Sequence, residues 1–352
     1  MWILFRFLSG LYLKNFFIIF FSLLSFYIGI DLLVNFNSLP HSANLTLLYI
    51  FFLMCSAIAY VLPLSLVFAF VLAFISMIRA NELVSLYALG LSKNKVIFFP
   101  FLWAVFFCFV FIGLNFTSFA YASQYKSSII RNGTLIKQSG EAFLKLNDDF
   151  VYIQKIENGQ NALKEVTIFH IKEGNLTSFT KAQKAEFKDN AWFLENGSVS
   201  MLPQEYKLGA TGLERNEFEN IQSLKDFKPK IIENLANQSG YSLSDIFESF
   251  KVLRAQNINT DNLKIVLYKF VIMPFFAPFV MLILYFFFPV ISRFVNLAFV
   301  AFTSFVILLL VWGMLFLLSR LSENGVLQAE LGIILPIIVL AFYSGFLSYK
   351  HR

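Results

Sequence analysis

Long apolar runs constrain this chain more than any other feature, because six of them are each long enough to cross a lipid bilayer. A helix needs about 20 residues to cross the hydrocarbon core. We predict spans at Phe16–Val34, Leu45–Ile78, Val96–Tyr121, Leu263–Phe288, Phe294–Leu318 and Leu331–Tyr349. Of the 352 residues, 58% are hydrophobic and 14% are charged, which is typical of an integral membrane protein and excludes a soluble globular one.

The apolar runs also divide the chain into four parts. The first part, residues 1–121, holds three spans, and the second, residues 122–240, is polar. A connecting helix at residues 241–262 then leads from the polar part to residues 263–352, which hold three more spans. The polar part alternates apolar and polar residues, as in FLKLNDDFVYIQKI, and turn signals recur from Asn147-Asp148-Asp149 to Glu195-Asn196-Gly197. We therefore predict an α-helical membrane protein with six transmembrane helices and an inserted all-β, jelly-roll-like or sandwich domain. Ser242 or Ser244 is expected to cap the connecting helix.

The positive charge of the chain indicates its orientation. The net charge is +6, but residues 122–262 hold 17 bases and 18 acids, so the excess of 11 bases over 4 acids belongs to the membrane parts. With six spans, one side of the membrane receives Arg6, Lys14, Arg79, Lys93, Lys95, Arg293, Lys350 and Arg352. Since basic loops stay inside, we predict cytoplasmic termini, a periplasmic β domain and an inner-membrane location, and no nucleic-acid surface.

A short segment between the second and third spans, reading RANELVSLYALGLSKNKVIFFP, is predicted to form a helix on the membrane surface over residues 80–91. Leu83, Leu86 and Tyr87 recur at helical spacing, and Gly90 can end the helix. Glu82 is the single acid of this basic segment. It has two interpretations: a solvated residue favoured by the helix dipole, or a docking residue for a soluble partner.

Two charges near predicted spans are candidates for function. Lys269 lies near the start of the fourth span, where it either snorkels to the headgroups or faces a cavity or a partner. Asp31 lies at the outer end of the first span, either at the interface or in a lumen. Pro274 and Pro278 are expected to bend the fourth span.

No motif indicates an enzyme. The chain has no G-x-x-x-x-G-K-[ST] loop, no G-x-S-x-G elbow and no H-E-x-x-H sequence, so we expect no ATP site in this chain. Its two cysteines and three histidines are scattered, and we expect neither disulfides nor a metal site. The acids Asp148 and Asp149 are read as turn residues and not as a catalytic pair.

The order of elements, with the loop motif, resembles the permeases of lipopolysaccharide export, the LptF/LptG (YjgP/YjgQ) family. The loop pattern of this family is matched by Asn81, Glu82, Leu83, Gly90, Leu91 and Ser92. Further matches are Leu62-Pro63-Leu64, the stretch FVYIQKI at residues 150–156 and Leu335-Pro336, and the FVYI and SLSDI segments look more like LptG than LptF.

The resemblance implies a transport subunit and its partners. Such permeases pair as an LptF/LptG heterodimer, bind two copies of the ATPase LptB, and pass lipopolysaccharide to the β domains of the permease and LptC and then to LptA. ATP is used by the ATPase partner. Glu82 matches the coupling acid of the family, within a coupling segment formed by Glu82, Leu83, Leu86, Tyr87 and Gly90.

The resemblance also implies residues that contact the lipid. Lys269 lies close to a basic position of the family, whereas relatives carry a lysine in the first span where this chain has Gly29, Ile30 and Asp31. In the β domain, an apolar interior is expected to accept acyl chains. We predict Lys269, Asp31, Phe150, Tyr152, Ile168 and Phe169 as the lipid-binding residues.

The alternative function is a membrane-anchored periplasmic sensor or an envelope assembly factor without transport activity. A sensor needs an output domain, and no predicted cytoplasmic segment exceeds about twenty residues. A lipoprotein-releasing permease usually has four spans, so the predicted six spans argue against it.

Overall fold

The computed structural model describes residues 2–40, 42–133, 138–139, 142–146, 149–157, 162–172, 175–188, 191–203, 212–224, 229, 241–255, 260–291 and 295–351. The chain packs as two compact units. One consists of Met1–Asn37, Leu53–Phe119 and Asp261–Arg352, and the other of Ser38–Phe52 and Ala120–Thr260. The first unit contains most of the apolar helices, and the second contains the sheet.

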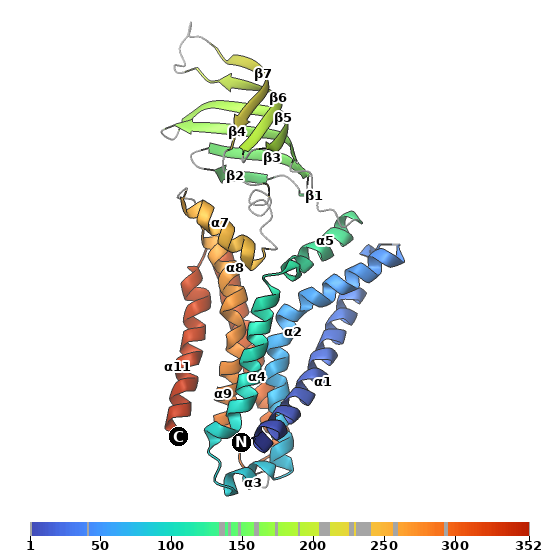
Figure 1. The fold of residues 1–352 in the computed structure, drawn as a ribbon, viewed down its shortest axis with the longest axis vertical. Helices are drawn as coiled ribbons and strands as arrows, with labels where there is room; N and C mark the ends of the chain where they lie inside the picture. The colour runs from blue at the N-terminus through green and yellow to red at the C-terminus, as the bar shows by residue number, and fades with distance from the viewer. Residues whose placement is uncertain are drawn as a thin grey trace. The chain divides into compact units, whose positions relative to one another are not determined.

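Long apolar helices make up the first unit (Figure 1). They are α1 (Trp2–Val34), α2 (Ala43–Arg79), the short α3 (Glu82–Ala88), α4 (Lys93–Leu114), α8 (Asp261–Val271), the 3-10 turn η3 (Met273–Phe275), α9 (Phe276–Phe287), α10 (Leu297–Glu323), the π-helical turn η5 (Glu330–Ile334) and α11 (Leu335–Lys350). Six helical segments of the described chain are long and apolar enough to cross a membrane, which confirms the predicted number of spans.

The fourth span is broken in the middle, as the prolines predicted. Helix α8 ends at Val271, η3 follows around Pro274, and α9 begins at Phe276. Proline has no N–H to donate and its ring collides with the preceding turn, so the α-helical pattern cannot continue through it. The span therefore consists of two helices joined by one tight turn.

Helix α9 lies in the centre of the helical packing. It contacts both α4 and α11 (Figure 1), and its Met281 sulfur lies 3.8 Å from the hydroxyl oxygen of the buried Tyr12 of α1. The same hydroxyl donates to the carbonyl of Leu66 in α2 at 3.2 Å. The core around these contacts is apolar, so Tyr12 supplies one of the few polar ties between the first, second and fourth spans.

The last two spans approach each other closely at Gly332 of η5. A Cβ atom at this position would lie 2.0 Å from the Ser322 hydroxyl and 3.0 Å from the Leu318 carbonyl of α10. Both distances are too short for a side chain, so only glycine lets η5 pack against α10 in this way.

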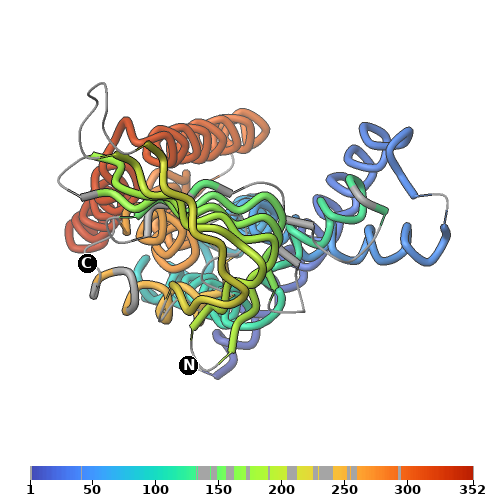
Figure 2. The backbone as a smooth tube through the Cα atoms, turned by 90° about the horizontal axis from the view of Figure 1, so that it is seen from above, coloured from blue at the N-terminus to red at the C-terminus, as the bar shows by residue number. Residues whose placement is uncertain are grey.

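The strands of the second unit form one antiparallel sheet. They are β1 (Gln138–Ser139), β2 (Ala142–Leu146), β3 (Asp149–Glu157), β4 (Ala162–Lys172), β5 (Asn175–Lys188), β6 (Ala191–Met201) and β7 (Glu214–Ser223). From β3 to β7 each strand pairs with the next along the chain, and β1 and β2 both pair with β3. The strands bend along their length (Figure 2). The inserted all-β domain is thus confirmed, as one bent sheet.

One row of residues across the sheet is left out of the pairing between strands. This row, here called the bent row, has one residue in each strand from β3 to β7. Its members are Gln154, Glu165, Gln183, Asn196 and Glu219. Glu165 and Asn196 have left-handed backbones with φ of 49° and 52°. The buried positions change phase here, from Val166 to Leu163 in β4 and from Ala182 to Ala185 in β5. In β4 and β5 a different set of side chains therefore turns inward beyond this row, whereas in β6 the buried positions keep one phase from Trp192 to Ser200.

The turn predicted at Glu195-Asn196-Gly197 is wrong, because β6 runs straight through it. Asn196 takes the left-handed conformation within the strand, and a Cβ atom on Gly197 would lie 2.3 Å from the Lys181 carbonyl. The bent row requires a left-handed backbone at one residue and no side chain at the next, and an Asn-Gly pair provides both, as it does in a hairpin turn. The turn predicted at Asn147-Asp148-Asp149 includes residues 147 and 148, which lie outside the described ranges. The strands on either side of it, β2 and β3, pair antiparallel.

Inward side chains of β3 to β6 form the core of the sheet. The core residues are Val151, Ile153, Leu163, Val166, Ile168, Ala182, Ala185, Trp192 and Leu194, all at most 1% exposed. A single flat sheet leaves one face open to solvent, so this burial requires the bend that wraps the strands around their own side chains.

Two helices of the second unit flank the sheet in sequence, α5 (Ala122–Asn132) and α7 (Leu243–Ala255). Helix α7 begins with a capping box: the Asp245 N–H donates to the Ser242 hydroxyl at 3.2 Å, and the Ser242 N–H donates to the Asp245 carboxylate at 3.1 Å. Of the two serines predicted as caps, Ser242 is thus the one used. The Tyr121 hydroxyl donates to the same carboxylate, which ties the segment entering the unit to the segment leaving it.

Candidate functional site

The short helix α3, between the second and third spans, is defined by two left-handed residues. Asn81 has φ 58° and separates α3 from α2, and Gly90 has φ 80° just beyond the end of α3. The Gly90 N–H donates to the Tyr87 carbonyl at 2.9 Å and the Leu91 N–H donates to the Leu86 carbonyl at 3.3 Å. This is a Schellman cap, which favours glycine at the left-handed position. Gly90 therefore ends the helix as predicted.

The apolar face of α3 packs onto the spans. Leu83 is 2% exposed and belongs to the main apolar core, and Leu86 and Tyr87 pack against the same core. The opposite face carries Ser85 and the C-terminal Leu89, which is 78% exposed. Of the five predicted coupling residues, three are thus used to attach the segment. Their role toward a partner stays a prediction.

Glu82 lies at the first position of α3, half-buried beside its helix. Among the residues that the structure describes, it has no ion-pair partner. A carboxylate in the first turn is favoured by the helix dipole, and its unused oxygens can accept hydrogen bonds from an external cation. The geometry is compatible with both interpretations of Glu82, the solvated residue and the docking residue.

Three hydrogen bonds join the segment around α3 to later spans. The hydroxyls of Tyr87 and Tyr285 are 2.8 Å apart, and the Tyr285 hydroxyl donates to the Lys93 carbonyl at 2.8 Å. The Asn94 amide donates to the Ser348 carbonyl of α11 at 2.9 Å. Burial raises the pKa of Tyr87, and the hydrogen bond to Tyr285 opposes this shift only partly. Tyr87 therefore remains protonated, and a hydrogen-bond donor, at neutral pH.

Charges at the opposite ends of the spans pair within the chain. Lys269 of α8 contacts Glu323 of α10, with 2.5 Å between Nζ and Oε1, and Arg320 contacts the other carboxylate oxygen at 2.7 Å. Lys264 lies 3.3 Å from Asp261 and 3.6 Å from Glu330. Each of these three bases is therefore neutralised by an acid of the same chain.

Lys269 thus has an intramolecular partner that the sequence did not predict. Its side chain is 30% exposed and that of Glu323 is 26% exposed, so the pair lies at a partly open surface and a lipid headgroup can compete for the lysine. Asp31 lies near the end of α1 and accepts a hydrogen bond from the Asn35 amide at 3.1 Å. The lipid contacts predicted for both residues stay predictions.

The four β-domain residues predicted to contact lipid lie on two different faces. Ile168 is 1% exposed and belongs to the core, whereas Phe150, Tyr152 and Phe169 are half-buried on the other face. This second face carries a row of rings in which Phe143 stacks on Phe150 at 5.5 Å between centroids, with Phe169 next to it. In this conformation the core side chains fill the inward face themselves, so an acyl chain can reach Ile168 only if the sheet opens.

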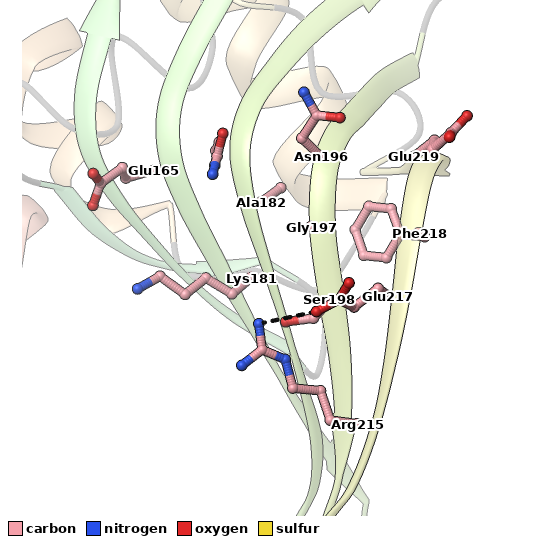
Figure 3. Close-up of a pocket in the computed structure, with 11 residues that line it drawn as sticks. Glu165, Lys181, Ala182, Asn196, Gly197, Ser198, Arg215, Glu217, Phe218 and Glu219 are labelled. Atoms are coloured by element: carbon pink, nitrogen blue, oxygen red, sulfur yellow. Dashed lines mark ion pairs between the residues drawn. The ribbon is translucent and has the colours of Figure 1, made fainter.

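A hollow of about 740 Å³ lies at the bent row of the sheet (Figure 3). Its lining is largely polar and comes from β4 to β7. Charged side chains around it are Glu165, Lys181, Arg215, Glu217 and Glu219, and Figure 3 shows the pairing of Arg215 with Glu217. Among the described residues that line it, Phe218 is the one large apolar side chain, and its ring lies over Gly197. A polar lining with both signs of charge does not suit an acyl chain, so this hollow is no candidate for the lipid.

Sequence reasoning missed Tyr285, Glu323 and Leu89. Glu323 carried a usable signal, since it is one of only four acids outside residues 122–262, and isolated acids near spans need partners. Tyr285 had no such signal, because it is one tyrosine in the apolar run MLILYFFF. Leu89 lies off the predicted apolar face of Leu83, Leu86 and Tyr87, so that face gave no indication of its role.

These features define a class: a multi-pass membrane protein with an inserted β domain and a helical loop between spans, without a nucleotide-binding motif of its own. The chain matches the family described as lipopolysaccharide export system permease LptF/LptG over residues 6–350. It therefore belongs to the LptF/LptG family of lipopolysaccharide export permeases, which confirms the resemblance. The match does not distinguish LptG from LptF. A search of curated protein sequences returned no match.

Proposed function

We propose that this chain is one permease subunit of an ATP-driven exporter that extracts lipopolysaccharide from the inner membrane and passes it through its β domain toward the outer membrane. The observation that carries this proposal is the family match over residues 6–350, together with six candidate spans that flank one inserted sheet in the sequence. The spans form the route out of the bilayer, and the sheet receives the lipid.

Extraction needs an external energy source. Each CH₂ group that leaves the bilayer for water costs about 0.8 kcal/mol, so several acyl chains together far exceed thermal energy. The chain has no P-loop, and we therefore assign ATP hydrolysis to a separate LptB-type ATPase dimer. A second, LptF-type permease completes the membrane part, and LptC- and LptA-type proteins receive the lipid in the periplasm.

The proposed orientation rests on the charges. On the α3 side, Arg6, Lys14, Arg79, Lys93, Lys95 and Lys350 have no ion-pair partner within the described part of the chain. On the other side, Lys264, Lys269 and Arg320 are all paired with acids. Lys and Arg are enriched in cytoplasmic loops, and the α3 side carries six of these bases against three on the other side. We therefore assign both termini and α3 to the cytoplasm and the sheet to the periplasm. A tag at residue 87 or 352 should be protected from external reagents, and one at residue 175 should be reachable.

Contact with the ATPase is assigned to Glu82 and the exposed end of α3. Glu82 has no partner of its own among the described residues and can accept charge-assisted hydrogen bonds from a cation of the ATPase. Leu83, Leu86 and Tyr87 hold α3 on the spans. Movement of the ATPase would then displace α3 and, through these attached residues, the spans.

Affinity purification in mild detergent tests this function. The tagged chain should co-purify an ATPase and a second six-span protein, and the complex should hold lipopolysaccharide. Purification of the chain without any ATPase, from membranes in which the ATPase is present, would favour the anchored sensor instead.

A further inference from the structure

The segment around α3 is attached to the fourth span at one hydroxyl group. The Tyr285 hydroxyl of α9 lies 2.8 Å from the Tyr87 hydroxyl of α3 and 2.8 Å from the Lys93 carbonyl at the start of α4. Tyr285 has one hydroxyl proton, which goes to the carbonyl, so Tyr87 is the donor in the pair of hydroxyls. Tyr285 thus binds both sides of the loop that follows α3.

The ring of Tyr285 is held firmly by α2. Its side chain is 3% exposed and lies edge-on against Phe74, with 5.2 Å between centroids and 78° between planes. Phe70 contacts it from a second position at 6.3 Å. Because close-packed aromatic rings cannot rotate freely, the hydroxyl keeps its position relative to α9. A displacement of Tyr87 is therefore transmitted to α9 and not absorbed by the Tyr285 side chain.

Helix α9 can move separately from α8, the other half of the fourth span, when α3 is displaced. The break at η3 around Pro274 separates α9 from α8, and helices change direction most easily at such breaks. Helix α8 carries Lys269, whose ammonium group pairs with Glu323. A continuous series of contacts thus leads from α3 through Tyr285 and the η3 turn to the charged end of α8.

We propose that Tyr285 is a positioning residue that couples the displacement of α3 to the cytoplasmic half of the fourth span. The proposal rests on the proposed function, because it gives a role to the movement that the ATPase imposes on α3. The coupling runs through two hydrogen bonds of one hydroxyl group and not through apolar packing alone.

The test compares the variants Tyr87→Phe, Tyr285→Phe and the double variant in the complete complex, reconstituted in proteoliposomes. The measured quantity is the amount of lipopolysaccharide exported per ATP hydrolysed. Phenylalanine keeps each ring and removes only the hydroxyl. Loss of a buried hydrogen bond corresponds to a change of about fivefold in an equilibrium, so Tyr285→Phe should lower this ratio about fivefold.

The double variant separates coupling from general damage. Because Tyr87 acts through the Tyr285 hydroxyl, Tyr87→Phe should cause no further loss when Tyr285 is already phenylalanine. Tyr343→Phe serves as the matched control, because Tyr343 lies in α11 with 45% exposure and makes no hydrogen bond within the described chain. It should keep the wild-type ratio.

Three results would overturn the proposal. They are a wild-type ratio in Tyr285→Phe, additive losses in the double variant, and a loss explained entirely by a lower yield or thermal stability of the complex. Absence of ATP-dependent export by the wild-type complex would instead reject the proposed function, and the coupling role with it.

Discussion

The two leucines of the α3 segment should respond in opposite ways to truncation. Leu83 is 2% exposed in the main core, so Leu83→Ala leaves a cavity, and such a change in a buried site costs about 2–5 kcal/mol. Leu89 is 78% exposed, so Leu89→Ala should change the free energy of unfolding by no more than about 0.5 kcal/mol. If Leu89 inserts into the ATPase, its truncation should cost about 1–2 kcal/mol of binding instead, which is roughly a tenfold weaker complex.

Two measurements separate these effects. Thermal unfolding of the permease in detergent should show a clear loss of stability for Leu83→Ala and none for Leu89→Ala. Titration of the purified ATPase onto the permease should show weaker binding for Leu89→Ala at unchanged permease stability. The assignment of the two faces is refuted if Leu83→Ala is as stable as the wild type, or if Leu89→Ala binds the ATPase with undiminished affinity.

Three further predictions concern single contacts. Gly332→Val should destabilise the protein by about 1–3 kcal/mol, because the facing helix leaves no room for a Cβ atom, whereas Gly345→Val, in open space, should be neutral in the same thermal unfolding assay. Glu323→Gln should increase retention of lipopolysaccharide in native mass spectrometry by less than about tenfold, since it frees Lys269 from a partly exposed ion pair; unchanged retention would argue against headgroup binding there. Asp245→Ala removes a helix cap and should lower stability by about 1 kcal/mol, and equal protease resistance of variant and wild type would contradict this.

Hydrophobicity made the membrane helices predictable. Every predicted span corresponds to one of the six apolar helical segments, the fourth of them broken at η3, because in lipid all backbone groups must be paired within the segment. Helix α1 extends further toward the N-terminus than the predicted first span, since it begins at Trp2 and the span was predicted from Phe16. The residues before Phe16 include polar side chains, which end an apolar run but do not end a helix.

The bent row of the sheet was not predictable from alternation. Alternation of inward and outward side chains assumes that a strand keeps one phase along its length. Here the buried positions change phase beyond Glu165 in β4, from Leu163 to Val166, and likewise in β5, from Ala182 to Ala185. Ile168 and Phe169 were both predicted to contact lipid, but neighbours in one strand point to opposite faces of the sheet, and only Ile168 lies in the core. Asn196-Gly197 was predicted as a turn because a hairpin turn and the bent row of β6 favour the same pair of residues.

The contacts of the candidate site depend on pairs that are distant in sequence. Tyr87 and Tyr285 are 198 positions apart, and Lys269 and Glu323 are 54 positions apart. No local pattern links such residues, and only the packing of α3 against α9 and of α8 against α10 brings them together. The sequence could identify the α3 segment and Gly90 as its end, but not the spans to which the segment is attached.

The most direct test of the account is ATP-dependent transfer of lipopolysaccharide from proteoliposomes that contain this chain, its partner permease and the ATPase to the periplasmic acceptor protein. The wild-type complex should transfer the lipid only when ATP is hydrolysed. Glu82→Ala should abolish transfer at normal protein levels, because truncating one partner of a desolvated pair costs about 2–5 kcal/mol, while Lys93→Ala should transfer normally. Full transfer by Glu82→Ala, or transfer by the wild type without ATP, would contradict the account.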